Sequence, residues 1–169
     1  MNYDIIYKSY DNLYIEEQTR KLNIISKIIK VRKTDKLLDI GCGTTVSTNF
    51  FKCFSIGIDS EFNMLNTGKG NRICGYAESL PFKNNSFDII LAITSVHHFN
   101  DLKRAISEIK RTAKQNSKIV ITLLKKSERF DRIKAALMEN FNLNIVEEDK
   151  DIIFYNWNQE ILHTKNLIY

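Results

Sequence analysis

The chain has 169 residues, of which 43% are apolar and 27% charged, a composition that suits one compact domain with a full hydrophobic core. It excludes a disordered chain as the default, and no segment approaches the roughly 20 apolar residues of a membrane-spanning helix. The net charge of +5 is uneven, because residues 103–134 contain eleven Lys and Arg residues but three acids. Such a basic stretch leaves a nucleic acid open as a partner, although solvated helix faces explain most runs of this kind.

The start of the chain and its cysteines bear on cellular location and metal binding. No basic flank followed by an apolar run begins the chain, so we expect no secretory signal and a cytoplasmic protein. The three cysteines, Cys42, Cys53 and Cys74, form no C-x-x-C pair, and the histidines lie elsewhere in the chain. We therefore expect buried thiols and no metal site.

The predicted elements begin with an amphipathic helix. Apolar residues recur at helical spacing over Asp11–Lys30, with basic residues between them. The short apolar run Leu37–Ile40 predicts a buried strand that ends in a glycine turn, Gly41-Cys42-Gly43. Thr44 or Thr45 is then expected to cap a helix.

The middle of the chain continues this alternation of strands and helices. Strands are expected over Phe54–Asp59 and Arg72–Gly75, with a brief helix between them. The runs Phe87–Thr94 and Lys118–Leu124 are almost continuously apolar, as expected of central parallel strands. Between these two runs, an apolar stripe at spacings of three and four predicts a helix with Asp101 as its N-cap.

The last part of the chain predicts a helix followed by a hairpin. Residues Glu128–Phe141 repeat the helical signature, and Leu143–Glu148 and Ile152–Trp157 are typical of two strands joined by a turn. Alternating strands and helices that end in such a hairpin favour an open α/β sheet with helices on both faces.

Glycines and aspartates gather where the first two predicted strands end. All six glycines lie between Gly41 and Gly75, and Asp39 and Asp59 stand twenty residues apart. In doubly wound sheets, ligands bind outside the carboxyl ends of the strands, and an acid at the second strand can accept both hydroxyls of a ribose. The sequence therefore places a candidate ligand site at this edge of the sheet.

A dinucleotide does not fit this glycine turn. The G-x-G-x-x-G fingerprint needs a third glycine where the chain has Val46, and the carboxylate of Asp39 would repel a pyrophosphate. The phosphate-binding sequence G-x-x-x-x-G-K-[ST] occurs nowhere in the chain. A cationic cofactor fits the acidic turn better.

Several motifs in order resemble the class I S-adenosylmethionine-dependent methyltransferases, in the branch similar to methyltransferase type 11. They are Leu38–Thr44, Gly57–Asp59, Gly75–Phe82, Ser86–Asp88, Thr94–Phe99 and Ala105–Arg111. Each motif alone is weak, but together they extend the resemblance over residues 5–124. It implies a Rossmann-like, doubly wound, mostly parallel sheet of about seven strands with a C-terminal antiparallel hairpin. It also implies a single domain, in which residues 1–33 cover the cofactor site and residues 34–169 form the core.

The resemblance further implies S-adenosylmethionine as the cofactor and S-adenosylhomocysteine as its product. Asp39, Gly41, Cys42 and Gly43 would shape the turn around the methionine part of the cofactor, and Asp59 would hold its ribose. The other residues that the resemblance places beside the cofactor are Ser60, Met64, Tyr76, Ala77, Ser95, and Tyr10 or Tyr14. The sulfonium and ammonium of this cofactor are positive, which agrees with the presence of acidic residues, and not basic ones, at the predicted ligand site.

The methyl acceptor is less constrained by the sequence. Methyl transfer from a sulfonium is an in-line displacement, so positioning supplies much of the catalysis, and a base is needed only when the acceptor carries a proton. His97 and His98 follow the fourth predicted strand and are candidate bases, with packing and loop capping as the alternative roles. We expect a small-molecule acceptor, and transfer RNA is the alternative because of the basic stretches.

A cofactor-binding module without transferase activity is a further alternative. Thr45 stands where many members of the resembling family have a third glycine, and Tyr76 stands where many have an acid facing the adenine. No membrane association is expected, and the sequence does not determine the oligomeric state.

Overall fold

The computed structural model describes residues 3–157 of the chain, and its side chains from Ile15 onward. The strands of this part are β1 (Lys36–Ile40), β2 (Phe54–Asp59), β3 (Arg72–Cys74), β4 (Phe87–Ala92), β5 (Ala113–Leu124), β6 (Asn144–Glu147) and β7 (Asp151–Tyr155). The helices are α1 (Tyr3–Ile28), α2 (Phe62–Thr67), α3 (Leu102–Thr112) and α4 (Phe130–Asn140), with a 3-10 turn, η1, over Val96–His98.

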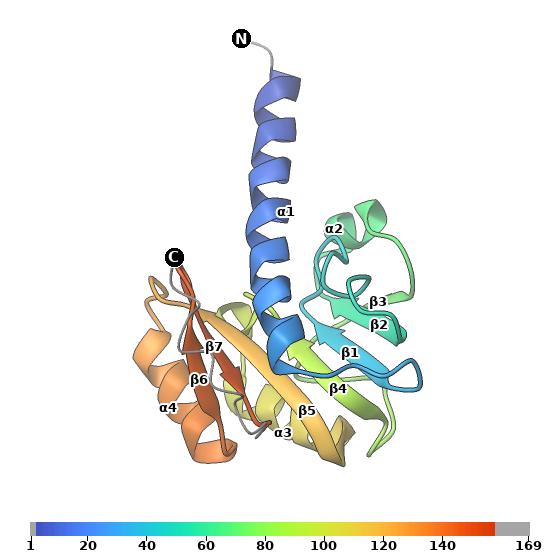
Figure 1. Ribbon diagram of the computed structural model, residues 1–169, viewed down its shortest axis with the longest axis vertical. Helices are drawn as coiled ribbons and strands as arrows, with labels where there is room; N and C mark the ends of the chain where they lie inside the picture. Colours follow the sequence, from blue (N-terminus) through green and yellow to red (C-terminus); the bar gives the residue numbers. More distant parts are fainter. Residues whose placement is uncertain (1–2, 158–169) are drawn as a thin grey trace.

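One sheet contains all seven of these strands, in the order β3-β2-β1-β4-β5-β7-β6 (Figure 1). The strands β1 to β5 pair in parallel, and β7 runs antiparallel to both β5 and β6. This arrangement confirms the predicted α/β sheet, mostly parallel with a C-terminal antiparallel hairpin. The strand order reverses between β1 and β4, and open α/β sheets bind ligands at the carboxyl ends of the strands at such a reversal.

Helices cover both faces of the sheet. Successive side chains of a strand point to opposite faces, so Leu37 and Leu38 of β1 enter different hydrophobic cores. Leu37 packs in the core under α1, to which that helix contributes Leu22, Ile25 and Ile29. Leu38 packs in the core that α3 and α4 cover. The predicted helices on both faces are thereby confirmed.

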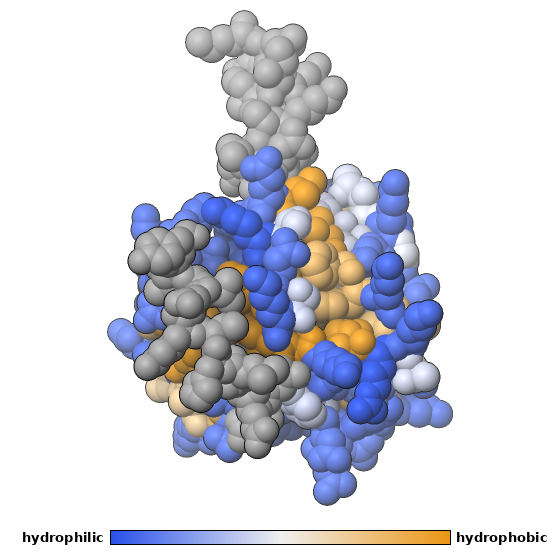
Figure 2. All heavy atoms as spheres, in the orientation of Figure 1, coloured by the Kyte–Doolittle hydropathy of each residue, from blue (hydrophilic) through white to orange (hydrophobic). Residues whose placement is uncertain are grey.

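The N-terminal helix lies on the sheet along its C-terminal half, and its first turns extend beyond the sheet (Figure 1). In the space-filling view, apolar side chains gather beside the base of this helix and hydrophilic side chains surround them (Figure 2). Among residues 3–157, no helix combines the length and the hydropathy that crossing a bilayer requires.

The helix expected after the glycine turn does not form, which corrects the prediction for Thr44 and Thr45. The chain instead makes successive turns between β1 and β2. Thr45 has a φ of 67°, whereas an N-cap residue needs an extended backbone, and its hydroxyl accepts a hydrogen bond from the N–H of Lys69 (2.9 Å). The hydroxyls of Ser47 and Thr48 donate to a buried carboxylate. These local side-chain bonds replace helical ones.

Other elements follow the prediction closely. The strand β2 covers the predicted residues, and Asp101 caps α3 by accepting a hydrogen bond from the N–H of Arg104 (3.1 Å). The strand β5 begins at Ala113, before the predicted start at Lys118, because Ala113 already pairs with Phe87 of β4. The helix α1 also begins earlier than predicted.

Candidate functional site

A cavity of about 630 Å³ opens at the carboxyl ends of β1, β2 and β4. Its walls come from the glycine turn after β1, the start of α2, the loop after β3, and the segment that runs from the end of β4 into η1. Pockets for small molecules typically enclose roughly 300–1,000 Å³. The residues that the sequence assigned to the site and that line this cavity are Gly41, Gly43, Asp59, Ser60, Met64, Tyr76, Ala77, Ser95 and His98.

The remaining candidate residues are placed differently. Asp39, Cys42 and His97 are not among the lining residues. The thiol of Cys42 is buried against Gly57, where a Cβ would lie 2.5 Å from its Sγ, and burial raises the pKa of this thiol. Cys42 therefore packs the turn onto β2. The side chain of Tyr14, like that of Tyr10, falls outside the described residues.

Gly41 and Ser95 bring two walls of the cavity into contact. Gly41 has a φ of +73°, and a Cβ at this position would lie 2.3 Å from the Cβ of Ser95. The hydroxyl of Ser95 donates a hydrogen bond to the carbonyl of Ile40 (2.7 Å). Both the backbone conformation and the close approach of the chain after β4 therefore require glycine here.

Asp59, at the end of β2, holds the glycine turn from the other side. Its Oδ2 accepts a hydrogen bond from the N–H of Gly43 (2.7 Å), and its Oδ1 accepts one from the N–H of Glu61 (2.9 Å). A carboxylate offers about four acceptor positions, so both oxygens keep capacity toward the cavity. Asp59 can therefore accept hydroxyl groups of a ligand while it fixes the turn.

Asp39 is fully buried and supports the turn from inside the protein. Its Oδ2 accepts hydrogen bonds from the hydroxyls of Ser47 (2.7 Å) and Thr48 (2.6 Å), while its Oδ1 has no partner within residues 3–157. Burial raises the pKa of this carboxyl to about 6, although the two hydroxyls oppose the shift. Any influence of Asp39 on a ligand would therefore pass through the turn.

The two histidines after β4 have different surroundings. His98 is exposed and lines the cavity, whereas His97 is half-buried and its Nδ1 has no hydrogen-bond partner among the described residues. Burial, together with smaller electrostatic contributions from His98, Lys21 and Arg129, lowers the pKa of His97 to about 4. Of the two, His98 is placed to contact a ligand in the cavity.

The cavity wall carries acidic groups. Its described lining residues include Asp59, Glu61 and Glu78 but neither lysine nor arginine. Like charges repel across such a small volume, so this wall disfavours a phosphate group. A ligand with positive charge, or one that carries no phosphate, fits it better.

Glu78 is a residue of the cavity wall that was not among the site residues predicted from the sequence. Its Oε1 accepts hydrogen bonds from the N–H groups of Asn100 (2.7 Å) and Asp101 (3.1 Å). These bonds fix the loop after β3 to the segment that enters α3, and both segments line the cavity. Membership of the motif Gly75–Phe82 was the available signal, but it does not show what an acid at this position contacts.

Part of the basic stretch over residues 103–134 is paired with acids. Arg111 forms an ion pair with Glu108 (2.7 Å), and Lys114 forms one with Asp88 (2.7 Å). Asp88 stands near the start of β4, at the opposite end of that strand from the cavity. These pairs reduce the positive charge that the stretch presents to a polyanion.

Known proteins resemble this chain across the residues that form the cavity. The family model described as a methyltransferase domain matches residues 38–121. An uncharacterised protein of Methanocaldococcus jannaschii is 32% identical over 136 residues, which cover 79% of this chain and 57% of that protein. A demethylmenaquinone methyltransferase of Streptomyces avermitilis is 30% identical over 105 residues, which cover 57% of this chain and 46% of that protein. The chain thus spans about half the length of these curated relatives.

The fold has counterparts among solved structures. A crystal structure of an S-adenosylmethionine-dependent methyltransferase from Thermotoga maritima matches with a TM-score of 0.69 at 16% identity, covering 88% of this chain and 94% of that one. The segment matched by the family model contains the glycine turn, Asp59 and Ser95, which meet at the cavity. The chain therefore belongs to the class I S-adenosylmethionine-dependent methyltransferase family.

Proposed function

We propose that the cavity binds S-adenosylmethionine and that the protein transfers the methyl group of this cofactor to a small molecule, releasing S-adenosylhomocysteine. The acidic cavity wall, with Asp59 and without lysine or arginine among its described residues, carries this proposal. The cofactor has a positive sulfonium and a positive ammonium and no phosphate, so its charge complements this wall. The cavity volume of about 630 Å³ suits a ligand of this class.

The lining residues fit the parts of the cofactor in turn. Asp59 would accept hydrogen bonds from the ribose hydroxyls, because its oxygens keep free acceptor positions. The turn at Gly41 and Gly43 would receive the methionine part, with its backbone carbonyls facing the ammonium. The residues proposed to surround the adenine are Ser60, Met64, Tyr76 and Ala77. Ser95 would lie beside the methyl group.

Catalysis in this site would depend chiefly on orientation. When bound, S-adenosylmethionine supplies a methyl group already activated by the positive sulfur. The chain then has to hold the acceptor in line with that methyl group and to exclude water. His98 is the candidate base for an acceptor that carries a proton, because it lines the cavity. With a pKa of about 4, His97 is neutral at pH 7 and offers a packed ring in support of its neighbour.

Two observations support a small molecule as the acceptor. The curated relatives of this chain include demethylmenaquinone methyltransferases from several bacteria. In addition, Arg111 and Lys114 of the basic stretch form ion pairs with acids, which leaves less positive charge for binding an RNA. The pair of Lys114 lies near the start of β4, the end of that strand remote from the cavity.

The proposal is tested by offering the protein S-adenosylmethionine labelled on the methyl group together with a cell extract, which is then separated into small molecules, RNA and protein. We expect the label in the small-molecule fraction. Asp59→Ala should strongly reduce this labelling at a cofactor concentration that does not saturate the unaltered protein, and Asp88→Ala, a matched change at the opposite end of the sheet, should preserve it. Label in the RNA fraction would show that the acceptor is an RNA and not a small molecule. Absence of label from every fraction would contradict the proposed methyl transfer.

A further inference from the structure

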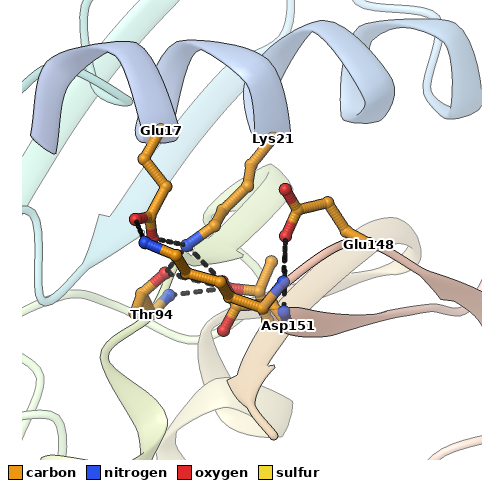
Figure 3. A network of polar contacts seen from close by, with 7 residues as sticks. Glu17, Lys21, Thr94, Glu148 and Asp151 are labelled. Carbon is orange, nitrogen blue, oxygen red and sulfur yellow. Dashed lines mark hydrogen bonds and ion pairs between the residues drawn. The ribbon is translucent and has the colours of Figure 1, made fainter. Parts of the chain in front are cut away.

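A lysine is buried at the junction between α1 and the sheet. The side chain of Lys21 is fully buried, on the same helix face as Leu22, Ile25 and Ile29. Its ammonium pairs with the fully buried carboxylate of Asp151, at the start of β7, and with Glu17 one helical turn earlier (2.8 Å) (Figure 3). A charge in this environment needs good partners, because burial removes its hydration.

The same ammonium also bonds to the cavity wall. Its Nζ donates a hydrogen bond to the hydroxyl of Thr94 (3.0 Å), which in turn donates to the Oδ2 of Asp151 (3.5 Å). Thr94 lies two residues beyond the end of β4 and lines the cavity. A network that begins on the N-terminal helix and on β7 therefore ends at a residue that faces the proposed ligand site.

Thr94 has a strained backbone. Its φ is 53°, in the left-handed region, which is an outlier for a β-branched residue. The surrounding contacts hold it there: its N–H donates to the hydroxyl of Thr122 on β5 (2.7 Å), and its own hydroxyl is fixed by Lys21 and Asp151. Strain of this kind persists only where neighbouring groups over-determine the conformation, and it is concentrated at functional sites.

The conformation of Thr94 sets the position of the next residue. Ser95 donates to the carbonyl of Ile40 and lies so close to Gly41 that no Cβ fits between them. A different backbone angle at Thr94 would therefore displace Ser95 from the glycine turn. The contact between these two cavity walls depends on how Thr94 is held.

We propose that Lys21 and Asp151 are positioning residues for the cavity: they hold Thr94 in its left-handed conformation and thereby fix Ser95 against the glycine turn. Docking of α1 on the sheet and binding of a ligand in the cavity are then coupled, and each favours the other. The identity of the ligand in this inference rests on the proposed function, whereas the ordering of the cavity wall does not.

The test compares three variants. Lys21→Met removes the charge and keeps the length of the side chain. Lys21→Met combined with Asp151→Leu removes both buried charges, a replacement that restores stability in other buried ion pairs. Lys114→Met is the matched control, because Lys114 pairs with Asp88 near the start of β4, remote from the cavity.

Two readouts are measured on each variant and on the unaltered protein. Amide hydrogen exchange of residues 94–98, without ligand, reports the order of the cavity wall, and calorimetry with S-adenosylhomocysteine reports affinity. We expect faster exchange in that segment and affinity at least about tenfold weaker in both Lys21 variants, even where the double variant regains its melting temperature. Lys114→Met should match the unaltered protein in both readouts.

The inference is overturned if the double variant regains affinity and slow exchange together with its melting temperature, because the pair would then serve stability alone. If Lys21→Met does not fold, Thr94→Ala and Thr94→Ser decide: binding by the serine variant should exceed that by the alanine variant, and equal binding would refute the role of the hydroxyl. If the unaltered protein does not bind S-adenosylhomocysteine, the proposed function fails, and the exchange rates alone still decide the inference.

Discussion

Two walls of the cavity are held in different ways. On the first wall, Asp59 at the end of β2 fixes the glycine turn through the N–H of Gly43. These two residues are 16 positions apart, and the bond joins a backbone N–H to a carboxylate. On the second wall, Thr94 is held by the side chains of Lys21 and Asp151, which are 73 and 57 residues away along the chain.

This difference indicates which changes each wall tolerates. The first wall should be sensitive to added side-chain volume in the glycine turn, because its backbone leaves no room at Gly41. The second wall should be sensitive to the loss of a buried charge, because removing one partner leaves the other uncompensated. Variants that separate volume from charge can therefore test whether the two walls are built as described.

The largest effect on stability is expected at the second wall. Lys21→Met leaves the carboxylate of Asp151 buried without its counter-charge, which should lower the free energy of unfolding by about 3–5 kcal/mol. Urea unfolding monitored by circular dichroism measures this change. Lys114→Met removes a more exposed pair and should cost about 1 kcal/mol or less. Equal losses of unfolding free energy in the two variants would show that the buried ion pair stabilises the protein no more than the exposed one.

The next largest effect is expected in the glycine turn of the first wall. Gly41→Ala places a Cβ 2.3 Å from that of Ser95, at a φ of +73°. We expect a loss of about 2–4 kcal/mol in unfolding free energy from the combined strain and overlap. In Gly43→Ala the new Cβ would contact only Met64, at an ordinary distance of 3.5 Å. We therefore expect a smaller loss of unfolding free energy, about 1–2 kcal/mol, from the positive φ alone. Thermal and urea unfolding of both variants measure these losses. A larger loss in Gly43→Ala than in Gly41→Ala would contradict the close contact between Gly41 and Ser95.

Smaller effects on stability are expected from a change in pH. One titratable residue lies beside each wall, and the stability contributions of the two residues change with pH in opposite directions. The pKa of Asp39 is raised from 3.8 to about 6, so its contribution to stability is full below pH 3.8 and is lost as pH rises through 6. The pKa of His97 is lowered from 6.5 to about 4, so its contribution is full above pH 6.5 and is lost as pH falls through 4.

The two contributions can be separated by substitution. As pH is lowered from 6.5 to 4, the unfolding free energy of Asp39→Asn should fall more steeply than that of the unaltered protein, and that of His97→Gln should fall less steeply. Urea unfolding at several pH values within this interval gives the slopes. Identical slopes in all three proteins would contradict the buried environments of these two groups.

Sequence patterns predicted local elements beside the cavity better than contacts between residues that are distant along the chain. The strand Phe54–Asp59 and the cap at Asp101 were correctly predicted, because hydrophobic runs and capping residues act locally. The helix expected after Thr45 was wrong, since hydrogen bonds to Lys69, distant in sequence, hold Thr45 at positive φ.

The role of Lys21 was beyond sequence reasoning. A lysine four residues before Ile25 on the apolar face of an amphipathic helix was the visible signal, yet such a residue usually extends its charge into water. Its partners are Asp151 on β7 and Thr94 in the segment after β4, and only the folded sheet brings them together. The strain at Thr94 likewise depends on these contacts rather than on its own sequence neighbours.

Calorimetric titration with S-adenosylhomocysteine tests most directly whether the acidic cavity binds the cofactor through Asp59. We predict saturable binding at one site per chain, weakened roughly 10- to 100-fold by Asp59→Ala, as expected for the loss of charged hydrogen bonds. Asp88→Ala should leave the affinity unchanged. Absence of binding by the unaltered protein, or equal affinity in Asp59→Ala, would contradict the claim.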